Sequence, residues 1–331
     1  MEFELIRRYF KNATLGNSGA GVLVGIGDDC AVLKTDSAKH LCISTDTLIC
    51  GTHFLENDDP FLLGWKALAV NLSDCAASGA TPRWALLAMS IPSADNLWQG
   101  RIAEFSKGFL KCAKNFDVAL IGGDTTRGCW TITVTILGEA KSPILRSGAQ
   151  IADDIWLSGE IGWAACGLDL RLNPQSAVHF LSKDLKEKAF CHLHQPIPRV
   201  KLGESLQNLA TSAIDLSDGL IGDLRHICAE SKCSAHLALK HFPQTLLKIL
   251  PRDLALQKMF SGGEDYELLF SAPKSARHAI FNIGKSLQTP LFRIGYFAEL
   301  SESPIFLMDE NGQNIAQNFQ GFEHFSTVNQ K

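Results

Sequence analysis

Strand-like and helix-like patterns alternate along almost the whole chain, and this alternation restricts the fold more than any other feature. Short apolar runs rich in β-branched residues predict strands, and longer segments with helical spacing separate them. Such alternation is typical of α/β or α+β domains. The chain has 331 residues, which is long for a single core, so we expect two lobes.

The first half predicts an amphipathic helix at 2–11 and a mixed set of strands and helices after it. The expected strands are 30–34, 40–49, 83–91, 118–122 and 130–137, and the expected helices are 60–77 and 94–115. Gly79 and Pro82 follow the helix at 60–77 as stop signals. The segment 138–152 is the best candidate for a boundary, so we predict domains at 1–138 and 139–331.

The second half repeats the alternation with more polar helical material. Strands are expected at 154–158, 213–216, 265–271, 291–296 and 304–308, and helices at 162–170, 218–230 and 274–286, with further helical material at 176–209. The predicted architecture is therefore an N-terminal mixed sheet with helices, followed by a C-terminal α/β domain.

Composition and charge exclude several protein classes. The content of 46% hydrophobic and 20% charged residues is ordinary for a globular protein, and the net charge of −4 gives no reason to expect nucleic acid. The N-terminus has no apolar export segment, and no run is long enough to cross a membrane. The ten cysteines lack a CxxC pair and stand mostly among apolar residues. We therefore expect reduced thiols, no cysteine-bound metal and a cytoplasmic protein.

Aspartates recur in short, turn-like motifs with apolar flanks. The motifs are GIGDDC at 25–30, STDT at 44–47, NLSD at 71–74, GGDTTRG at 122–128 and DLSDG at 215–219. Carboxylates brought together in such surroundings repel one another and are costly to desolvate. The accompanying ligands are oxygens, which suit Mg²⁺ better than Zn²⁺, and protein-bound Mg²⁺ usually shares its carboxylates with phosphates. The motifs therefore predict phosphate chemistry.

Each motif also has a plain structural explanation. Asp28 and Asp29 are neighbours that point to opposite sides of an extended chain, and either a metal site or a solvated turn accounts for them. Thr45 and Asp46 alternate in the same way within an apolar strand. Asp74 lies on a helix, where it could bind metal or simply pair with Lys66 or Asn71.

The later motifs leave similar alternatives. Asp124 follows a strand and paired glycines, at the edge of the sheet where ligands often bind. Asp215 ends a strand, and Ser217 is well placed to cap a helix that starts at Asp218; the same helix start could instead offer N–H groups to a phosphate. Glu264 follows two glycines, in a turn that either presents one acid or is purely structural.

Two common nucleotide motifs are not met. GIGDDC lacks the third glycine of GxGxxG and precedes a strand, and the GKS at 284–286 has Ala279 where a P-loop needs glycine. A bound ATP would use neither motif.

Taken together and in order, the motifs resemble those of the thiamine-monophosphate kinase family. The resemblance rests on GIGDDC, STDTLICGTHF, KALAVNLSDCAASGA, LIGGDTTRG, AIDLSDGL and SGGEDYELLF, and it extends over nearly the whole chain. DLSDG is shared with the wider superfamily of aminoimidazole ribonucleotide synthetase and selenophosphate synthetase. The resemblance implies an aminoimidazole ribonucleotide synthetase-like fold of two lobes and a homodimer formed through the N-terminal sheet.

The resemblance also implies an activity and a set of site residues. The activity is phosphorylation of thiamine monophosphate to thiamine diphosphate by ATP with several Mg²⁺ ions, the last step in making that coenzyme. The 1–138 domain would bind metal and ATP and dimerise, and the 139–331 domain would complete the site. At matching positions, the implied metal ligands are Asp29, Ser44, Thr45, Asp46, Asp74, Asp124, Asp215 and Asp218. The implied ATP contacts are Gly123, Arg146 and Ser217. The implied substrate contacts are His53, Glu264 and Phe322.

The chain departs from the family pattern at one turn. The family commonly has Pro-Gly-Asp after Arg-Ser-Gly-Ala, where this chain has Ile151, Ala152 and Asp153. Arg146 is retained, so the departure concerns the conformation of the turn between the lobes.

The implied acceptor is a phosphate that already carries an anionic oxygen, so no general base is required, and we expect direct in-line transfer. Two other functions remain open. One is ATP-dependent activation of an amide or selenide, although the first cysteine, Cys30, lies inside a predicted metal motif. The other is a nucleotide- or metal-binding regulatory module without turnover.

Overall fold

The computed structural model describes residues 22–24, 32–33 and 38–322. The predicted helix at 2–11, the GIGDDC motif and most of the predicted strand at 30–34 lie outside these residues. The chain divides into two compact units, one of Met1–Cys75 with Ala80–Pro143 and one of Ala76–Gly79 with Ile144–Lys331. The division after Pro143 falls within the segment 138–152. In the part that the structure describes, no helix is long and apolar enough to cross a membrane.

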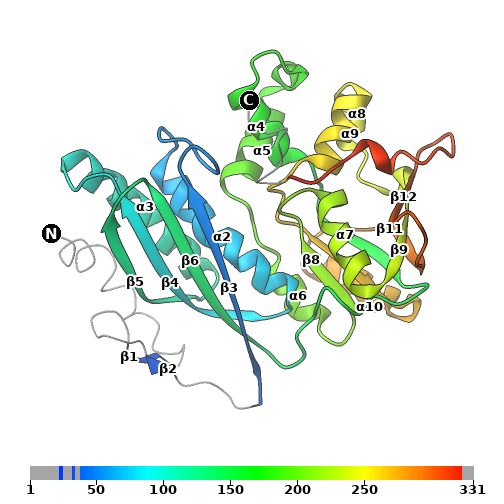
Figure 1. Cartoon of the computed structure of the whole chain (residues 1–331), viewed down its shortest axis with the longest axis horizontal. Helices are drawn as coiled ribbons and strands as arrows, with labels where there is room; N and C mark the ends of the chain where they lie inside the picture. Colours follow the sequence, from blue (N-terminus) through cyan, green and yellow to red (C-terminus); the bar gives the residue numbers. More distant parts are fainter. Residues whose placement is uncertain (1–21, 25–31, 34–37, 323–331) are drawn as a thin grey trace. The chain divides into compact units, whose positions relative to one another are not determined.

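The first unit is built on a four-stranded mixed sheet in the order β3-β6-β4-β5. Its strands are β3 (His40–Ile49), β4 (Thr81–Ile91), β5 (Ala119–Arg127) and β6 (Thr131–Ala140). β3, β6 and β4 pair antiparallel, and β4 and β5 pair parallel. Helices α2 (Pro60–Ala77) and α3 (Asn96–Asn115) lie behind this sheet in Figure 1. The short strands β1 (Val22–Val24) and β2 (Val32–Leu33) pair with each other.

Helices α2 and α3 approach each other at two glycines. A Cβ atom on Gly64 would lie 2.0 Å from the carbonyl oxygen of Phe105, and one on Gly108 would lie 1.8 Å from that of Phe61. No side chain fits in either place, so the backbones can pack directly. The side chain of Asp95 caps α3 by accepting a hydrogen bond of 3.0 Å from the Trp98 N–H.

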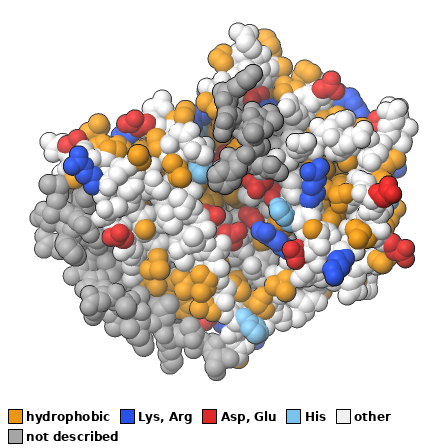
Figure 2. Space-filling view, in the orientation of Figure 1, with side chains coloured by type: hydrophobic (Ala, Val, Ile, Leu, Met, Phe, Trp, Pro, Cys, Tyr) orange, Lys and Arg blue, Asp and Glu red, His pale blue; other side chains and the backbone are white. Residues whose placement is uncertain are grey.

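The two faces of this sheet differ in what covers them. Ile132, Val134 and Ile136 of β6 are buried on the helix side, whereas the alternate residues of β3 on the other face are exposed. Leu41 is 45% exposed and Ile43 is 61% exposed, and Figure 2 shows hydrophobic side chains gathered over this sheet. Among the described elements none covers this part of β3, so we call this side of the sheet the open face.

The second unit has a six-stranded mixed sheet in the order β12-β9-β11-β7-β10-β8. The strands are β7 (Asp154–Ser158), β8 (Ser212–Asp215), β9 (Cys233–Ala238), β10 (Leu268–Ala272), β11 (Leu291–Glu299) and β12 (Ile305–Met308). Only the β12–β9 pair is parallel. The helices are α4 (Trp163–Leu172), α5 (Lys183–His194), α6 (Val200–Leu206), α7 (Leu220–Ser231), α8 (Thr245–Ile249), α9 (Arg252–Ser261) and α10 (Arg277–Ser286). Two mixed sheets with helices confirm the predicted α/β class.

Several elements differ from the sequence prediction. Strand β5 continues through GGDTTR to Arg127 instead of ending at residue 122, because β4 keeps pairing with it to the end. Helix α7 begins at Leu220 rather than 218, and β10 begins at Leu268 rather than 265. Strand β9 and helices α8 and α9 were not predicted, because their short apolar stretches have no clear period.

A buried acid anchors β7 to helix α10 and to the neighbouring strand β11. Asp154 is 1% exposed. It accepts hydrogen bonds of 2.5 and 2.7 Å from Arg277 and one of 3.3 Å from Arg293. Burial alone would raise the pKa of Asp154, but the two guanidinium groups hold it below its ordinary value.

The divergent turn at 150–153 has a left-handed residue in it. Ala152 has φ +71°, and the Asp153 N–H donates to the Gln150 carbonyl at 3.0 Å. This combination is that of a type II turn, whose third residue is usually glycine. The Ala152 N–H donates to the Phe297 carbonyl at 2.8 Å, which fixes the turn to β11. The turn is thus formed with alanine where the family commonly has glycine.

The described part of the chain contains nine cysteines, and all nine are free thiols. Cys129 and Cys191 are exposed, and the other seven are buried or half-buried.

Candidate active site

In the first unit, a strand and a helix bring several oxygen ligands to one side of the sheet. The Ser44 hydroxyl on β3 donates to the Asp74 carboxylate on α2 at 2.6 Å. The Asp46 N–H donates to the Asn71 side-chain oxygen at 3.1 Å, and the Asn71 amide donates to the Ala67 carbonyl at 3.1 Å. Three predicted ligands, Ser44, Asp46 and Asp74, therefore lie together where β3 runs along α2.

Asn71 also belongs to this arrangement, although from the sequence it was named only as a possible partner of Asp74 and not as a site residue. Its position in NLSD, three residues before Asp74, is the signal that could have identified it. Its side chain joins α2 to β3 beside the predicted ligands, so it holds the strand in register with the helix.

The structure places two other predicted ligands on the open face. The Thr45 hydroxyl is hydrogen-bonded to that of Thr135, so its side chain points away from Asp46. Asp124 shares a cross-strand row with Ala88, Thr133 and Thr47, and paired residues lie on the same side of a sheet. The Thr45 side chain therefore lies on the open face, and only its backbone is available on the face that Asp74 contacts. The Asp124 side chain also lies on the open face.

Gly123, one of the three predicted ATP contacts, is a position where the backbone requires glycine. It has φ +153°, and a Cβ atom there would lie 1.8 Å from the Leu87 carbonyl oxygen. The sequence suggested that the paired glycines permit a close approach, and the approach is that of β5 to β4. Asp124 lies within β5 as an exposed residue, not beyond its end.

His53 lies in the turn directly after β3. Its ring atom Nδ1 accepts a hydrogen bond of 3.0 Å from the Ile49 N–H, and its own backbone N–H donates to the Ile49 carbonyl at 2.9 Å. In the neutral ring the proton is therefore on Nε2. This arrangement suits His53 to donate a hydrogen bond to a substrate.

In the second unit, the DLSDG motif forms a turn between β8 and α7. Asp215 is the last residue of β8 and is buried, and Ser217 and Asp218 are half-buried. The expectation that Ser217 caps the helix was wrong: the cap is Gly219, with φ +104° and no side-chain bond. The helix starts two residues later than predicted because Gly219 turns the chain first.

Asp223 completes this turn and was not among the predicted site residues. It is 2% exposed, and its Oδ2 atom accepts hydrogen bonds of 3.1 Å from the Ser217 N–H and 3.2 Å from the Asp218 N–H. Burial, and then the neighbouring charges of Asp215 and Asp218, raise the pKa of Asp223 to about 8. An acid in the first turn of α7 was visible in DLSDGLIGD, but its contact with the turn was not.

The SGGE loop packs directly on the DLSDG turn. The Glu264 N–H donates to the Ser217 carbonyl at 2.8 Å, and a Cβ atom on Gly263 would lie 2.4 Å from that oxygen. Glu264 has φ +68°, a conformation that non-glycine residues adopt mainly where the surroundings enforce it. The Phe322 N–H donates to the Asp218 carbonyl at 2.9 Å. Four predicted site residues, Ser217, Asp218, Glu264 and Phe322, are thus brought together.

Two acids that follow Glu264 in the chain fix its loop by hydrogen bonds. Asp265 accepts hydrogen bonds of 2.7 Å from the Gly162 N–H and 3.4 Å from the Ala164 N–H, at the start of α4. Glu267 is 2% exposed. It accepts a hydrogen bond of 2.7 Å from the Arg199 Nε and a second one from the Arg199 Nη2. The strained residue is therefore followed directly by two buried anchors.

Arg146, another predicted ATP contact, lies apart from Ser217. Its carbonyl accepts a hydrogen bond of 3.1 Å from Ser231, the last residue of the 12-residue helix α7. At about 1.5 Å per residue, the far end of α7 is roughly 17 Å from its start. Arg146 and Ser217 therefore lie at opposite ends of α7.

The described residues do not form a complete metal cage. Among them, no three His, Cys, Asp or Glu side chains are grouped closely enough to hold a metal ion. Asp28 and Asp29 lie outside the described residues. The side-chain oxygens of Ser44, Asp46 and Asp74 are nevertheless of the kind that Mg²⁺ prefers when water and phosphate supply the remaining ligands.

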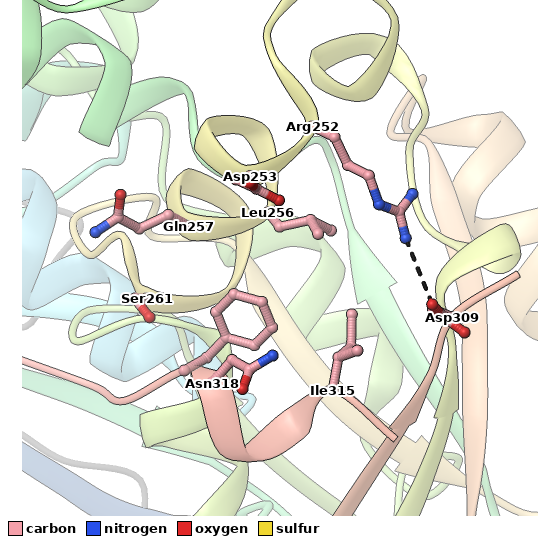
Figure 3. A pocket seen from close by; sticks show the side chains of 9 residues that line it. Arg252, Asp253, Leu256, Gln257, Ser261, Asp309, Ile315 and Asn318 are labelled. Carbon is pink, nitrogen blue, oxygen red and sulfur yellow. Dashed lines mark ion pairs between the residues drawn. The ribbon is translucent and has the colours of Figure 1, made fainter. Parts of the chain in front are cut away.

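A pocket of about 390 Å³ opens in the second unit beside the SGGE loop, between α9 and the segment 309–319. Figure 3 shows Ser261, the first residue of that loop, and Asn318 on the pocket wall, with Arg252 paired to Asp309 across the pocket at 3.8 Å. Arg252 also donates to Glu310, so its charge is compensated. No predicted site residue lines this pocket.

The chain is similar to known proteins over its full length. The model of the AIR synthase related protein, N-terminal domain, matches residues 27–140. The thiamine-monophosphate kinase of Escherichia coli (strain K12) is 42% identical over 330 residues, which is 98% of each chain. A crystal structure of the thiamine-monophosphate kinase from Stenotrophomonas maltophilia K279a has a TM-score of 0.82 at 38% identity and covers 94% of this chain and 96% of that one.

A second solved structure contains ligands. It is AaThiL complexed with AMPPCP and TMP, with a TM-score of 0.74 at 27% identity over 98% of this chain and 97% of that one. Full-length similarity at this level, together with the motifs in their places, assigns the family. The chain belongs to the thiamine-monophosphate kinase family.

Proposed function

We propose that this chain transfers the terminal phosphoryl group of ATP to thiamine monophosphate, which gives thiamine diphosphate and ADP. The observation that carries the proposal is the joining of Ser217 and Asp218 to Glu264 and Phe322 by backbone hydrogen bonds. The first pair is expected on the ATP side and the second on the substrate side. The related AaThiL complex with AMPPCP and TMP supports the choice of both substrates.

The reaction requires positioning more than acid–base chemistry. The acceptor oxygen belongs to a phosphate that is already ionised, so no side chain has to remove a proton from it. We infer direct in-line transfer, in which the acceptor oxygen bonds to the γ-phosphorus as the bond to the β-phosphate oxygen breaks. Glu264, Phe322 and the Nε2–H of His53 would orient the acceptor, and Ser217, Gly123 and Arg146 would contact ATP.

Several Mg²⁺ ions would accompany ATP. Ser44, Asp46 and Asp74 in the first unit, and Asp215 and Asp218 in the second, supply oxygen ligands of the type that Mg²⁺ prefers. The backbone of Thr45, with Asp29, is proposed to contribute as well, whereas Asp124, whose side chain lies on the open face, is left out of this ligand set. Bound Mg²⁺ would neutralise phosphate charge and so reduce the repulsion between two polyanions.

The test is an assay of the purified chain with ATP, MgCl₂ and thiamine monophosphate, with unphosphorylated thiamine as the matched control acceptor. We expect thiamine diphosphate from the monophosphate only, and loss of turnover when EDTA removes the metal. Folded protein that forms no thiamine diphosphate would refute the proposal, and a phosphorylated protein on the pathway would refute direct transfer.

Asp74→Asn tests the metal ligands of the first unit. We expect a fall in kcat of at least about 100-fold, because the variant keeps the hydrogen-bond acceptor for Ser44 and removes the charge. Asp117→Asn, on an exposed turn of the same unit, is the control and should keep normal turnover. Near-normal activity of Asp74→Asn would remove Asp74 from the metal site.

We further propose a cytoplasmic homodimer that forms through the open face of the first unit. The exposed Leu41 and Ile43 support it, because apolar residues gathered on a sheet face often mark an interface, and the free thiols are consistent with a reducing compartment. Ile43→Lys should shift the chain toward monomer in sedimentation velocity. Leu97→Lys, also highly exposed in this unit, is the control. A wild-type monomer at all concentrations would contradict the proposal.

A further inference from the structure

The backbone N–H and C=O groups of Ser217 and Asp218 are all hydrogen-bonded. The two N–H groups donate to a single atom, Oδ2 of Asp223, at 3.1 and 3.2 Å. The Ser217 carbonyl accepts from the Glu264 N–H at 2.8 Å, and the Asp218 carbonyl accepts from the Phe322 N–H at 2.9 Å. The turn therefore connects three segments that are distant in sequence.

Asp223 lies in an environment that a carboxylate would not otherwise favour. It is 2% exposed, and two other acids, Asp215 and Asp218, lie near enough to act on its charge. Burying an acid beside like charges is costly unless hydrogen bonds compensate for it. The bonds from the two N–H groups of the turn offset part of this cost.

These bonds also occupy two of the N–H groups that precede α7. Free N–H groups at the start of a helix could bind a phosphate, and the sequence left this alternative open for Ser217 and Asp218. Because Asp223 already accepts from both N–H groups, they are not available to a ligand. What the turn can offer outward are its side chains, the Ser217 hydroxyl and the Asp218 carboxylate.

We propose that Asp223 is a positioning residue for phosphoryl transfer, which fixes the ATP-side residues Ser217 and Asp218 relative to the substrate-side residues Glu264 and Phe322. This inference rests on the proposed function and goes beyond it, because Asp223 is a buried residue bonded to the turn and is not among the predicted substrate, ATP or metal contacts. It acts by accepting hydrogen bonds, so an uncharged acceptor of the same shape should replace it.

The first experiment does not depend on activity. Hydrogen–deuterium exchange, resolved to single amides, should show the Ser217 and Asp218 N–H groups strongly protected in the wild-type chain. They should stay protected in Asp223→Asn and lose at least about tenfold of their protection in Asp223→Ala. Unprotected Ser217 and Asp218 amides in the wild type would overturn the proposal.

The second experiment separates positioning from metal binding. Asp223→Asn should keep kcat/KM within about threefold of wild type, with an unchanged Mg²⁺ requirement. Asp223→Ala should lose roughly 10- to 100-fold in kcat/KM for thiamine monophosphate, since displacements near 1 Å can cost about 100-fold. Asp253→Ala removes an exposed acid from the first turn of α9 and should change nothing.

Two kinetic outcomes would overturn the proposal. If Asp223→Asn is as damaging as Asp223→Ala and needs more Mg²⁺, Asp223 is a metal ligand. If folded Asp223→Ala has normal kcat/KM, its role is structural only. If Asp223→Ala does not fold, the kinetics of Asp223→Asn and the amide exchange of the wild-type chain and of Asp223→Asn still test the proposal. A wild-type chain without any turnover refutes the proposed function, whereas the exchange measurement still tests Asp223.

Discussion

Replacing Ala152 by glycine should stabilise the second unit, which is the opposite of what this substitution usually does. Ala152 is exposed and has φ +71°. A left-handed conformation costs an L-residue roughly 1–2 kcal/mol, and glycine adopts it without this cost. The methyl group that would be removed points into solvent, so little packing is lost.

The expected gain follows from two opposing contributions. Relief of the left-handed conformation favours the variant by roughly 1–2 kcal/mol. The greater freedom of glycine in the unfolded chain disfavours it by about 0.5–1 kcal/mol. The net effect is a stabilisation of about 0.5–1 kcal/mol, or a rise of about 1–4 °C in Tm for a unit of this size.

The assay is urea unfolding and differential scanning calorimetry of a substitution series. At position 152 the order of stability should be Gly, Asn, Ala and then Val, because asparagine tolerates a left-handed backbone and β-branched residues do not. The matched control is Ala210→Gly, at a half-exposed loop position without positive φ, which should lose about 0.5–1 kcal/mol. If both glycine variants are destabilised equally, Ala152 is not strained as described.

Three further predictions concern stability. Gly108→Ala should lower the free energy of unfolding in urea by about 3 kcal/mol or more, because its Cβ would meet backbone at 1.8 Å. Gly100→Ala, on the same helix with open space around it, should raise this free energy by up to about 1 kcal/mol. Equal effects of the two substitutions would contradict the packing described. Arg199→Leu should cost about 3–5 kcal/mol by leaving Glu267 buried without its partner, and Arg199→Leu with Glu267→Leu should recover part of it. The pKa of Asp154 is lowered in the folded state, so the stabilisation by this carboxylate is present at neutral pH and is lost as the pH falls below about 4 through the folded pKa. Asp154→Asn should therefore unfold at lower urea concentration than wild type at pH 7, with a smaller difference between the two at pH 3. A difference that is the same at both pH values would contradict this.

Local patterns were sufficient for elements with clear start and stop signals. The predicted bounds of β3, α2 and β7 agree with the structure, because their apolar spacing and their flanking turn residues point to the same limits. Strand β5 was predicted too short. The glycines of GGDTTR resemble a turn in sequence, but β4 pairs with them to the end of the strand.

The arrangement of the site depended on contacts that sequence does not specify. Alternation predicted that Thr45 and Asp46 point to opposite sides, but the side on which Asp124 lies depends on pairing after a register shift at Ala85 and Leu86. The contact of Asp223 with its turn depends on how Gly219 directs the chain into α7. The placement of Arg146 at the far end of α7 depends on how the chain after it passes Ser231.

The most direct test of the central claim follows the phosphoryl group itself. The purified chain should be incubated with ATP carrying a labelled γ-phosphorus, MgCl₂ and thiamine monophosphate. We predict that the label appears in the terminal phosphate of thiamine diphosphate in a 1:1 ratio with ADP, with none bound to protein. Label found only in inorganic phosphate, or none released from ATP by folded protein, would contradict the account.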